Sequence, residues 1–216
     1  MKKFLLATFI VLLALGNVNT ASAQSVDTNV GVVGGTLSFV PEPFDFSNAT
    51  INSESVTVLE KSINNRIVDS RGSGGGWSVS LSASNFISDA VPDNSNSRAG
   101  STMTIRFPEN SLKVGNWSIY RNNDYGQEID PVNGPLKLTA PLVTLNSTPI
   151  QLIEAKKGFG MGSYINNLNF VLTVPYKGYV QSLSEAATSG YTLDQEVGIR
   201  ATNYKATFTY TLTSGI

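Results

Sequence analysis

Apolar residues alternate with Ser, Thr and Asn along much of the chain, and Gly and Pro interrupt the pattern at short intervals. Alternation with a period of two predicts strands that are buried on one face. The predicted strands cover residues 35–40, 55–59, 77–83, 103–107, 117–120, 136–139, 150–155, 170–174 and 204–212. Only residues 181–188 have the composition for a turn or two of helix. We therefore predict an all-β fold with about nine or ten strands, an antiparallel sandwich or a barrel-like single domain.

Two of these segments have an especially regular pattern. In residues 77–83 apolar side chains alternate with serine, and in residues 204–212 apolar or aromatic side chains alternate with Lys or Thr. One face of each strand is thus suited to burial and the other to water. We expect Trp77, Val79 and Leu81 to lie on one buried face, and Tyr204, Phe208, Tyr210 and Leu212 on another.

The N-terminal segment has the pattern of an export signal. Lys2 and Lys3 precede an apolar stretch over residues 4–15, and the small-x-small pattern of residues 21–23 follows. We predict a signal peptide over residues 1–23, with Gln24 as the new N-terminus and residues 24–216 as one domain. The apolar stretch is shorter than the roughly 20 residues that span a bilayer, so no membrane span is expected after cleavage.

The composition argues against several functional classes. Without the predicted signal the chain has 13 basic and 16 acidic residues, so it has no basic field to attract nucleic acid. It contains no cysteine and no histidine, which excludes disulfides, Ser-His-Asp and Cys-His catalysis, and histidine metal sites. We predict a protein that is not an enzyme and has no cofactor. A glycan would be bound by shape, stacking and hydrogen bonds.

Two glycine-rich segments precede predicted strands, residues 71–76 before Trp77 and residues 158–162 before Tyr164. A phosphate-binding loop needs a helix behind it, so these glycines indicate backbone of positive φ or close approach instead. The acidic residues between positions 122 and 130 lack the spacing of an EF-hand, and an exposed turn is favoured there over a Ca²⁺ site.

The two tryptophans allow different interpretations. The alternation at Trp77 favours a core side chain over an exposed platform for a sugar ring. Trp117 is compatible with either role. If Trp77 is in the core, the ligand contacts fall to the glycine-rich loops and their flanks, residues 70–76 and 158–164.

These motifs together resemble the WxL domain of Gram-positive cell-surface proteins. The proximal part reads Asp69-Ser70-Arg71-Gly72-Ser73-Gly74-Gly75-Gly76-Trp77-Ser78-Val79, with Val79 where the family has Leu. The distal part reads Tyr204-Lys205-Ala206-Thr207-Phe208-Thr209-Tyr210-Thr211-Leu212, with Phe208 for Leu and Tyr210 for Trp. Residues 158–162 followed by 170–175 also look like the middle of the family.

The resemblance implies non-covalent attachment to the cell surface through peptidoglycan or another wall glycan, together with other surface proteins. The binding residues predicted from the motifs and loops are Arg71, Gly74, Gly76, Trp77, Val79, Gly158, Gly160, Tyr164, Tyr204, Tyr210 and Leu212. Two alternatives remain open. One is a secreted matrix subunit that assembles through strand edges, and the other is a two-carboxylate hydrolase, for which no acid pair stands out.

Overall fold

The computed structural model describes residues 29–52, 54–137 and 141–215. The chain divides into two compact units, residues 1–32 and residues 33–216. The described residues of the first unit, 29–32, are exposed and form no regular element, and the predicted signal peptide lies outside the described residues. Every element reported below belongs to the second unit. In the part of the chain that is described, no helix is long and apolar enough to cross a bilayer.

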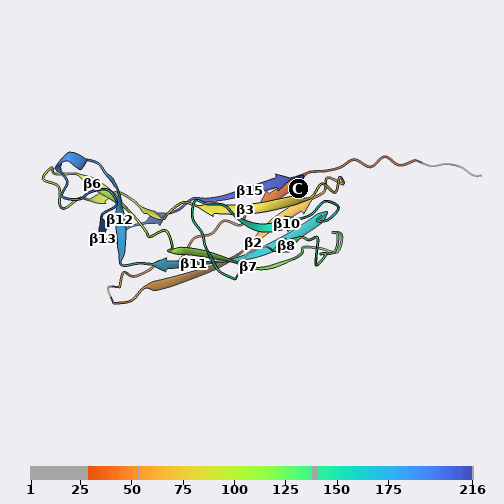
Figure 1. Ribbon diagram of the computed structural model, residues 1–216, viewed down its shortest axis with the longest axis horizontal. Coiled ribbons are helices and arrows are strands. Elements are labelled where there is room, and N and C mark those ends of the chain that lie inside the picture. Colours follow the sequence, from red (N-terminus) through yellow and green to blue (C-terminus); the bar gives the residue numbers. More distant parts are fainter. Residues whose placement is uncertain (1–28, 53, 138–140, 216) are drawn as a thin grey trace, which may run out of the picture. The chain divides into compact units, whose positions relative to one another are not determined.

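Sheet A is built on the pairing of two long strands. β2 (Thr57–Asp69) and β11 (Gly162–Val174) are antiparallel over 13 residues each, from Gly162 opposite Asp69 to Val174 opposite Thr57 (Figure 1). The other strands are β1 (Leu37–Val40) beside β2, then β7 (Leu112–Arg121) and β9 (Val143–Thr144) on the far side of β11.

Sheet B contains both motif segments side by side. Its order is β15 (Phe208–Ser214), β3 (Trp77–Ala83), β10 (Ile150–Ala155) and β8 (Leu136–Lys137). β3 alternates between buried apolar residues and half-buried serines, as its sequence predicts. The half-buried residues of β15 are its aromatic and apolar ones, which confirms the expected inward face.

Sheets A and B pack face to face through aromatic side chains. Phe170 of β11 lies 5.2 Å from Phe208 of β15, centroid to centroid, and Phe44 contacts both rings at 4.8 and 5.1 Å. A hydrogen bond 2.7 Å long from Asn116 Nδ2 to the Leu152 carbonyl also joins the layers. The fold is thus an antiparallel β sandwich, as the alternation predicts.

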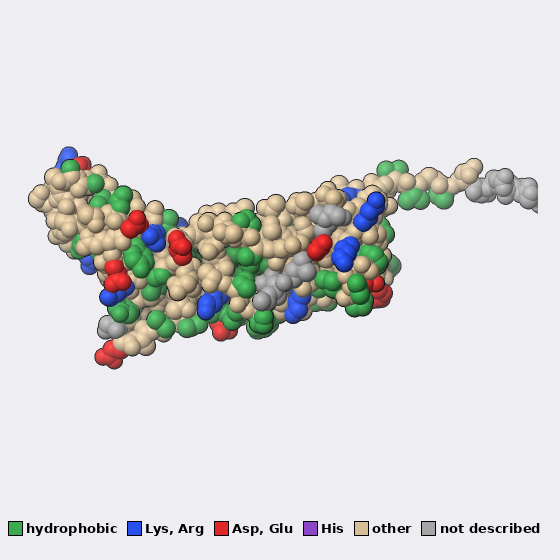
Figure 2. Space-filling model, in the orientation of Figure 1, with side chains coloured by type: hydrophobic (Ala, Val, Ile, Leu, Met, Phe, Trp, Pro, Cys, Tyr) green, Lys and Arg blue, Asp and Glu red, His purple; other side chains and the backbone are tan. Residues whose placement is uncertain are grey.

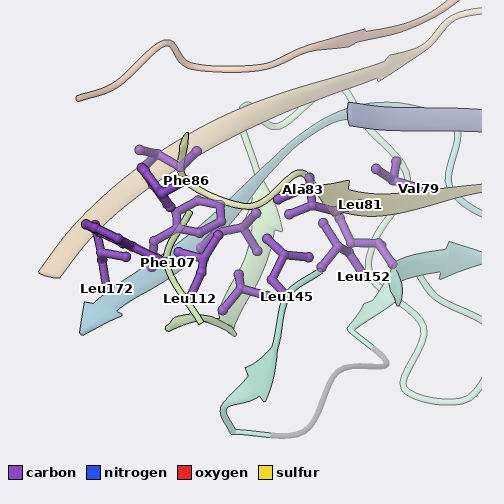
Figure 3. Close-up of a cluster of buried hydrophobic side chains, with 14 of the residues drawn as sticks. Val79, Leu81, Ala83, Phe86, Phe107, Leu112, Leu145, Leu152 and Leu172 are labelled. Atoms are coloured by element: carbon purple, nitrogen blue, oxygen red, sulfur yellow. The ribbon is translucent and has the colours of Figure 1, made fainter. Parts of the chain in front are cut away.

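A third sheet, sheet C, continues the same hydrophobic core. It consists of β13 (Glu196–Gly198), β12 (Lys177–Leu183), β6 (Thr102–Arg106), β4 (Ile87–Ser88) and β14 (Tyr204–Lys205), with β5 (Val91–Pro92) also paired to β6. Figure 3 shows Phe86 and Phe107 beside Leu112 and Leu172 of sheet A and near Leu81 of sheet B. One core therefore serves all three sheets.

The structure corrects three expectations. The described residues form 15 strands rather than nine or ten. The segment predicted as helical contributes its first residues to β12, and only the 3₁₀ turn η1 (Ala186–Thr188) remains. The predicted final strand over residues 204–212 is two strands in different sheets, β14 and β15. The predicted strand over residues 136–139 is described only as far as Lys137.

Tyr210 is a partly buried residue that packs against the core, and its hydroxyl lies near the Asn65 amide without a hydrogen bond of good geometry. Its ring lies 5.0 Å from that of Phe39, and both its hydroxyl and the buried amide nitrogen of Asn65 lack a bonding partner. Burial raises the pKa of Tyr210 to about 12, partly offset by the neighbouring Asn65. An exposed tyrosine titrates near 10, so the unfolded chain ionises first as the pH rises.

We expect Tyr210→Phe to keep most of the neutral-pH stability of the wild type, because it removes a hydroxyl that makes no hydrogen bond of good geometry. The stability contribution of neutral Tyr210 is present below about pH 10 and lost by about pH 12, so the variant should lose less stability over that range. Urea midpoints measured at several alkaline pH values check this. Tyr125→Phe, at a residue 96% exposed, is the control, and an equal alkaline loss in both variants would contradict the assignment.

Candidate functional site

Arg71, at the start of the proximal glycine-rich loop, joins the two ends of that loop through hydrogen bonds, an arrangement called the Arg71–Asp69 clamp below. Its guanidinium donates to both carboxylate oxygens of Asp69, at 2.9 and 2.8 Å, and also to the Gly76 carbonyl at 2.9 Å. Asp69 is 2% exposed, and its hydrogen bond raises the pKa of Arg71. The charge predicted to meet a ligand is therefore already paired within the loop, and the bidentate geometry holds the two ends of the loop together.

The glycines of this loop alternate for a conformational reason. Gly72, Gly74 and Gly76 have φ values of +70°, +59° and +69°. L-residues with a side chain rarely adopt this region, so every second position of the loop requires glycine. The expectation of positive φ is confirmed at these three positions.

The two glycine-rich loops contact one another. The Gly158 amide donates to the Gly74 carbonyl at 2.7 Å, and a Cβ on Gly74 would lie 3.5 Å from the Gly158 Cα. Residues 84 positions apart thus meet backbone to backbone. The structure brings together the two segments that the sequence analysis selected separately.

Trp77 is completely buried at this junction. Its Nε1 donates to the Gly160 carbonyl at 3.0 Å, and its ring lies 6.3 Å from that of Tyr164. A Cβ on Gly160 would lie 2.8 Å from Nε1 and 2.4 Å from the Ala155 Cβ. The structure therefore places Trp77 in the core, and its indole is not an exposed platform.

Tyr164 secures the other side of the same junction. Its hydroxyl lies within hydrogen-bond distance of the carbonyls of Gln127 and Met161, at 2.8 and 3.0 Å, and its single proton can be donated to either. Burial raises the pKa of Tyr164 to about 12. Tyr164 is fully buried. It ties the loop at Gly162 to the loop that contains Gln127.

The distal motif residues divide between two sheets. Tyr210 pairs with Leu81 and Leu212 pairs with Val79, so these two lie beside the proximal motif. Tyr204 pairs with Ser88 in sheet C, stacks on Phe107 at 4.3 Å and accepts a hydrogen bond from the Arg200 amide. The predicted site is therefore not one cluster, because Tyr204 belongs to a different sheet.

The solvent-facing part of the junction is small. Gly72, Ser73 and Gly158 are exposed, whereas Trp77, Val79 and Tyr164 are buried and cannot touch a large ligand in this conformation. The motif side chains support the loops from within. Direct ligand contact by the loops themselves stays a prediction.

The acidic segment near Asp130 has its carboxylates occupied by protein donors. Asp130 accepts from the amides of Val132 and Asn133, which lowers its pKa, and Glu128 pairs with Arg121 at 2.7 Å. No group of three His, Cys, Asp or Glu side chains that could hold a metal occurs among residues 29–52, 54–137 and 141–215. The observed geometry is that of an ordered turn.

Trp117 is the exposed tryptophan. It is 57% exposed on β7, and its carbonyl accepts from Lys137 Nζ at 2.9 Å. The alternation breaks at Gly115-Asn116-Trp117-Ser118, and that irregularity is the sequence signal that could have identified it.

The comparison with family models matches residues 34–215 to the WxL domain, described as surface cell wall-binding. This match covers most of the chain. The protein belongs to the WxL family. A search of curated proteins and a search of solved structures each found no match.

The glycine-rich junction lies within the residues matched to this cell wall-binding domain. The matched domain is described by wall binding and not by catalysis, which is consistent with the expectation of a binding protein. Acidic and basic side chains alternate over the face shown in Figure 2, without a broad field of one sign.

We expect Trp77→Ala to lower the free energy of unfolding by about 3 to 5 kcal/mol, because a fully buried ring leaves a cavity. Trp77→Phe retains most of the volume but strands the Gly160 carbonyl, so it should cost about 1 to 3 kcal/mol. Urea denaturation measures both values. A wild-type stability in Trp77→Ala would show that the indole does not belong to the core.

We also expect Gly160→Ala to destabilise the fold more than Gly158→Ala. Both glycines have positive φ, +78° and +88°, so alanine pays a similar backbone strain of about 1 to 2 kcal/mol at each. Only at Gly160 does a Cβ collide with Trp77 and Ala155, because the space at Gly158 is open within 4 Å. Equal melting temperatures for the two variants would argue against the close approach.

Proposed function

We propose that this WxL protein is exported and attaches non-covalently to the wall of a Gram-positive bacterium, with peptidoglycan as its ligand. The observation that carries the proposal is the family match over residues 34–215, a cell wall-binding domain. The predicted signal over residues 1–23 supports export, and the family resemblance supports membership of an assembly with other surface proteins. We further propose residues 24–216 as the mature domain.

The loop junction supports a contact region at one end of the sandwich. Gly72, Ser73 and Gly158 expose backbone and hydroxyl groups there, with Lys156 and Lys157 beside them. These groups can form hydrogen bonds with a glycan or a peptide stem. Trp77, Arg71 and Tyr164 hold the loops in position from within.

The test is sedimentation of the mature protein with purified peptidoglycan, and muramidase-digested wall serves as the control. Because the predicted mature chain has a small net charge, the bound fraction should be similar at roughly 0.1 M and 1 M salt, where the Debye length is about 10 Å and 3 Å. The Trp77→Phe variant should still bind, since the indole of Trp77 is buried in the wild type and does not contact the ligand. Failure of the wild type to pellet with intact wall would refute the proposal.

A matrix subunit that assembles through strand edges is the second candidate. One observation favours it: β15 is an edge strand of sheet B and pairs with β3 alone within the described residues. An open edge can accept another strand. Sedimentation velocity separates the candidates, because a matrix subunit grows with concentration and a wall-binding module keeps one sedimentation coefficient.

A further inference from the structure

A β-bulge turns Trp117 to the outer face of sheet A. β7 pairs Ser118 with Asn167 and then Asn116 with Leu168, so Trp117 is an extra residue without a partner in the register. The bulge lets Trp117 and Ser118 both face outward, while the buried Asn116 faces the core. Bulges often re-aim a side chain at a functional surface.

Buried amides hold this bulge in place. Asn166, which is fully buried, donates to Asn116 Oδ1 at 2.6 Å and to the Ser118 carbonyl at 3.1 Å. Asn116 in turn donates to the Leu152 carbonyl, and Lys137 Nζ donates to the Trp117 carbonyl. Burying an amide is costly unless it is hydrogen-bonded, and every amide group of this network except Asn166 Oδ1 has a partner, so the network stabilises the outward position of Trp117.

The face around Trp117 combines aromatic rings with side-chain amides. Asn64, Asn167 and Ser118 form a row across β2, β11 and β7, with an Asn167–Asn64 hydrogen bond 2.9 Å long. The next row along the strands ends in Tyr120, which is 47% exposed. Leu142, half exposed, lies with the Trp117 indole over Gly115.

This surface matches the chemistry of a glycan strand. The CH face of a sugar ring stacks on an indole, and asparagine side chains can both donate to and accept from hydroxyl and acetamido groups. Glu60, Arg66 and Lys113 are exposed on the same face, and Lys137 lies beside Trp117, so the face carries charges of both signs with a small positive excess. Aromatic rings set among side-chain amides are better suited to a polar polymer than to a hydrophobic partner.

We propose that the outer face of β2, β11 and β7 around Trp117 binds an N-acetylated glycan strand. This inference rests on the proposed wall attachment and names the polymer class and the surface that contacts it. The surface is distinct from the loops at residues 70–76, which the family motif identifies. It assigns a function to the tryptophan that lies outside the core.

The experiment titrates the mature protein with a hexamer of N-acetylglucosamine and follows tryptophan emission, alongside pelleting with intact peptidoglycan. Trp77 is buried, so the change in emission should come from Trp117 and persist in Trp77→Phe. We expect Trp117→Ala to weaken binding by about tenfold or more with an unchanged melting temperature. Trp117→Tyr should recover part of the affinity, because it restores an aromatic ring.

Tyr176→Ala is the matched control, an exposed aromatic residue beyond the end of β11 that lines a different hollow of about 210 Å³. It should bind like the wild type. If the wild type pellets with wall and Trp117→Ala binds equally well, the inference fails while the proposed attachment stands. The inference also fails if the wild type pellets with wall but does not bind the hexamer. It fails as well if Trp117→Ala loses only self-association and still binds the hexamer and the wall. If the wild type does not pellet, the proposed attachment itself fails.

Discussion

The buried indole of Trp77 sets the conditions for the whole loop end of the sandwich. Its N–H lies out of reach of water and needs an acceptor, which is the carbonyl of Gly160. That carbonyl reaches the indole because Gly160 has φ +78° and no side chain between Ala155 and the ring. The same loop then places the Gly158 amide on Gly74, whose own loop needs glycine at alternate positions and the Arg71–Asp69 clamp. The two glycine-rich loops therefore depend on one another, because both pack around the buried Trp77 side chain.

Core packing also accounts for two positions at which the chain departs from the motifs that it resembles. Val79 and Tyr210, which stand where the motifs that they resemble have Leu and Trp, both lie on the inward faces of paired strands, β3 and β15. A core tolerates exchange between apolar or aromatic side chains when the volume is nearly kept. The Tyr210 hydroxyl makes no hydrogen bond of good geometry, so Tyr210 contributes to the fold mainly through its ring. The motif positions in this protein work through packing.

Sheet A shows the reverse arrangement at its centre, with amides inside and an aromatic ring outside. Asn116 and Asn166 are buried and Trp117 is exposed. Asn166 donates to the Ser118 carbonyl beside the bulge and to Asn116 Oδ1. These hydrogen bonds offset part of the cost of burying the two amides, since Asn166 Oδ1 has no partner. Stability and binding are thereby separated: the inward residues of the sandwich hold the loops and the bulge, and the outward residues meet the solvent.

The period-two alternation by itself determined the all-β class, the bounds of β3 and β10, and the buried side of β3 and β15. The order of the glycine-rich and aromatic motifs determined the family. The full length of β2 and β11 was not predicted, because polar residues on the inner face, such as Asn65 and Asn166, interrupt the apolar pattern of these strands where they are buried.

Alternation also shows which side of a strand faces inward but not which sheet the strand joins. The sequence therefore predicts one strand that contains both Tyr204 and Tyr210. In the structure Tyr204 pairs with Ser88 in sheet C and Tyr210 pairs with Leu81 in sheet B, and the Thr207 amide bonds the Ser84 hydroxyl between them. The exposure of Trp117 was likewise decided by a bulge that depends on pairing with β11, a partner about 50 residues away, and local sequence does not encode such long-range contacts.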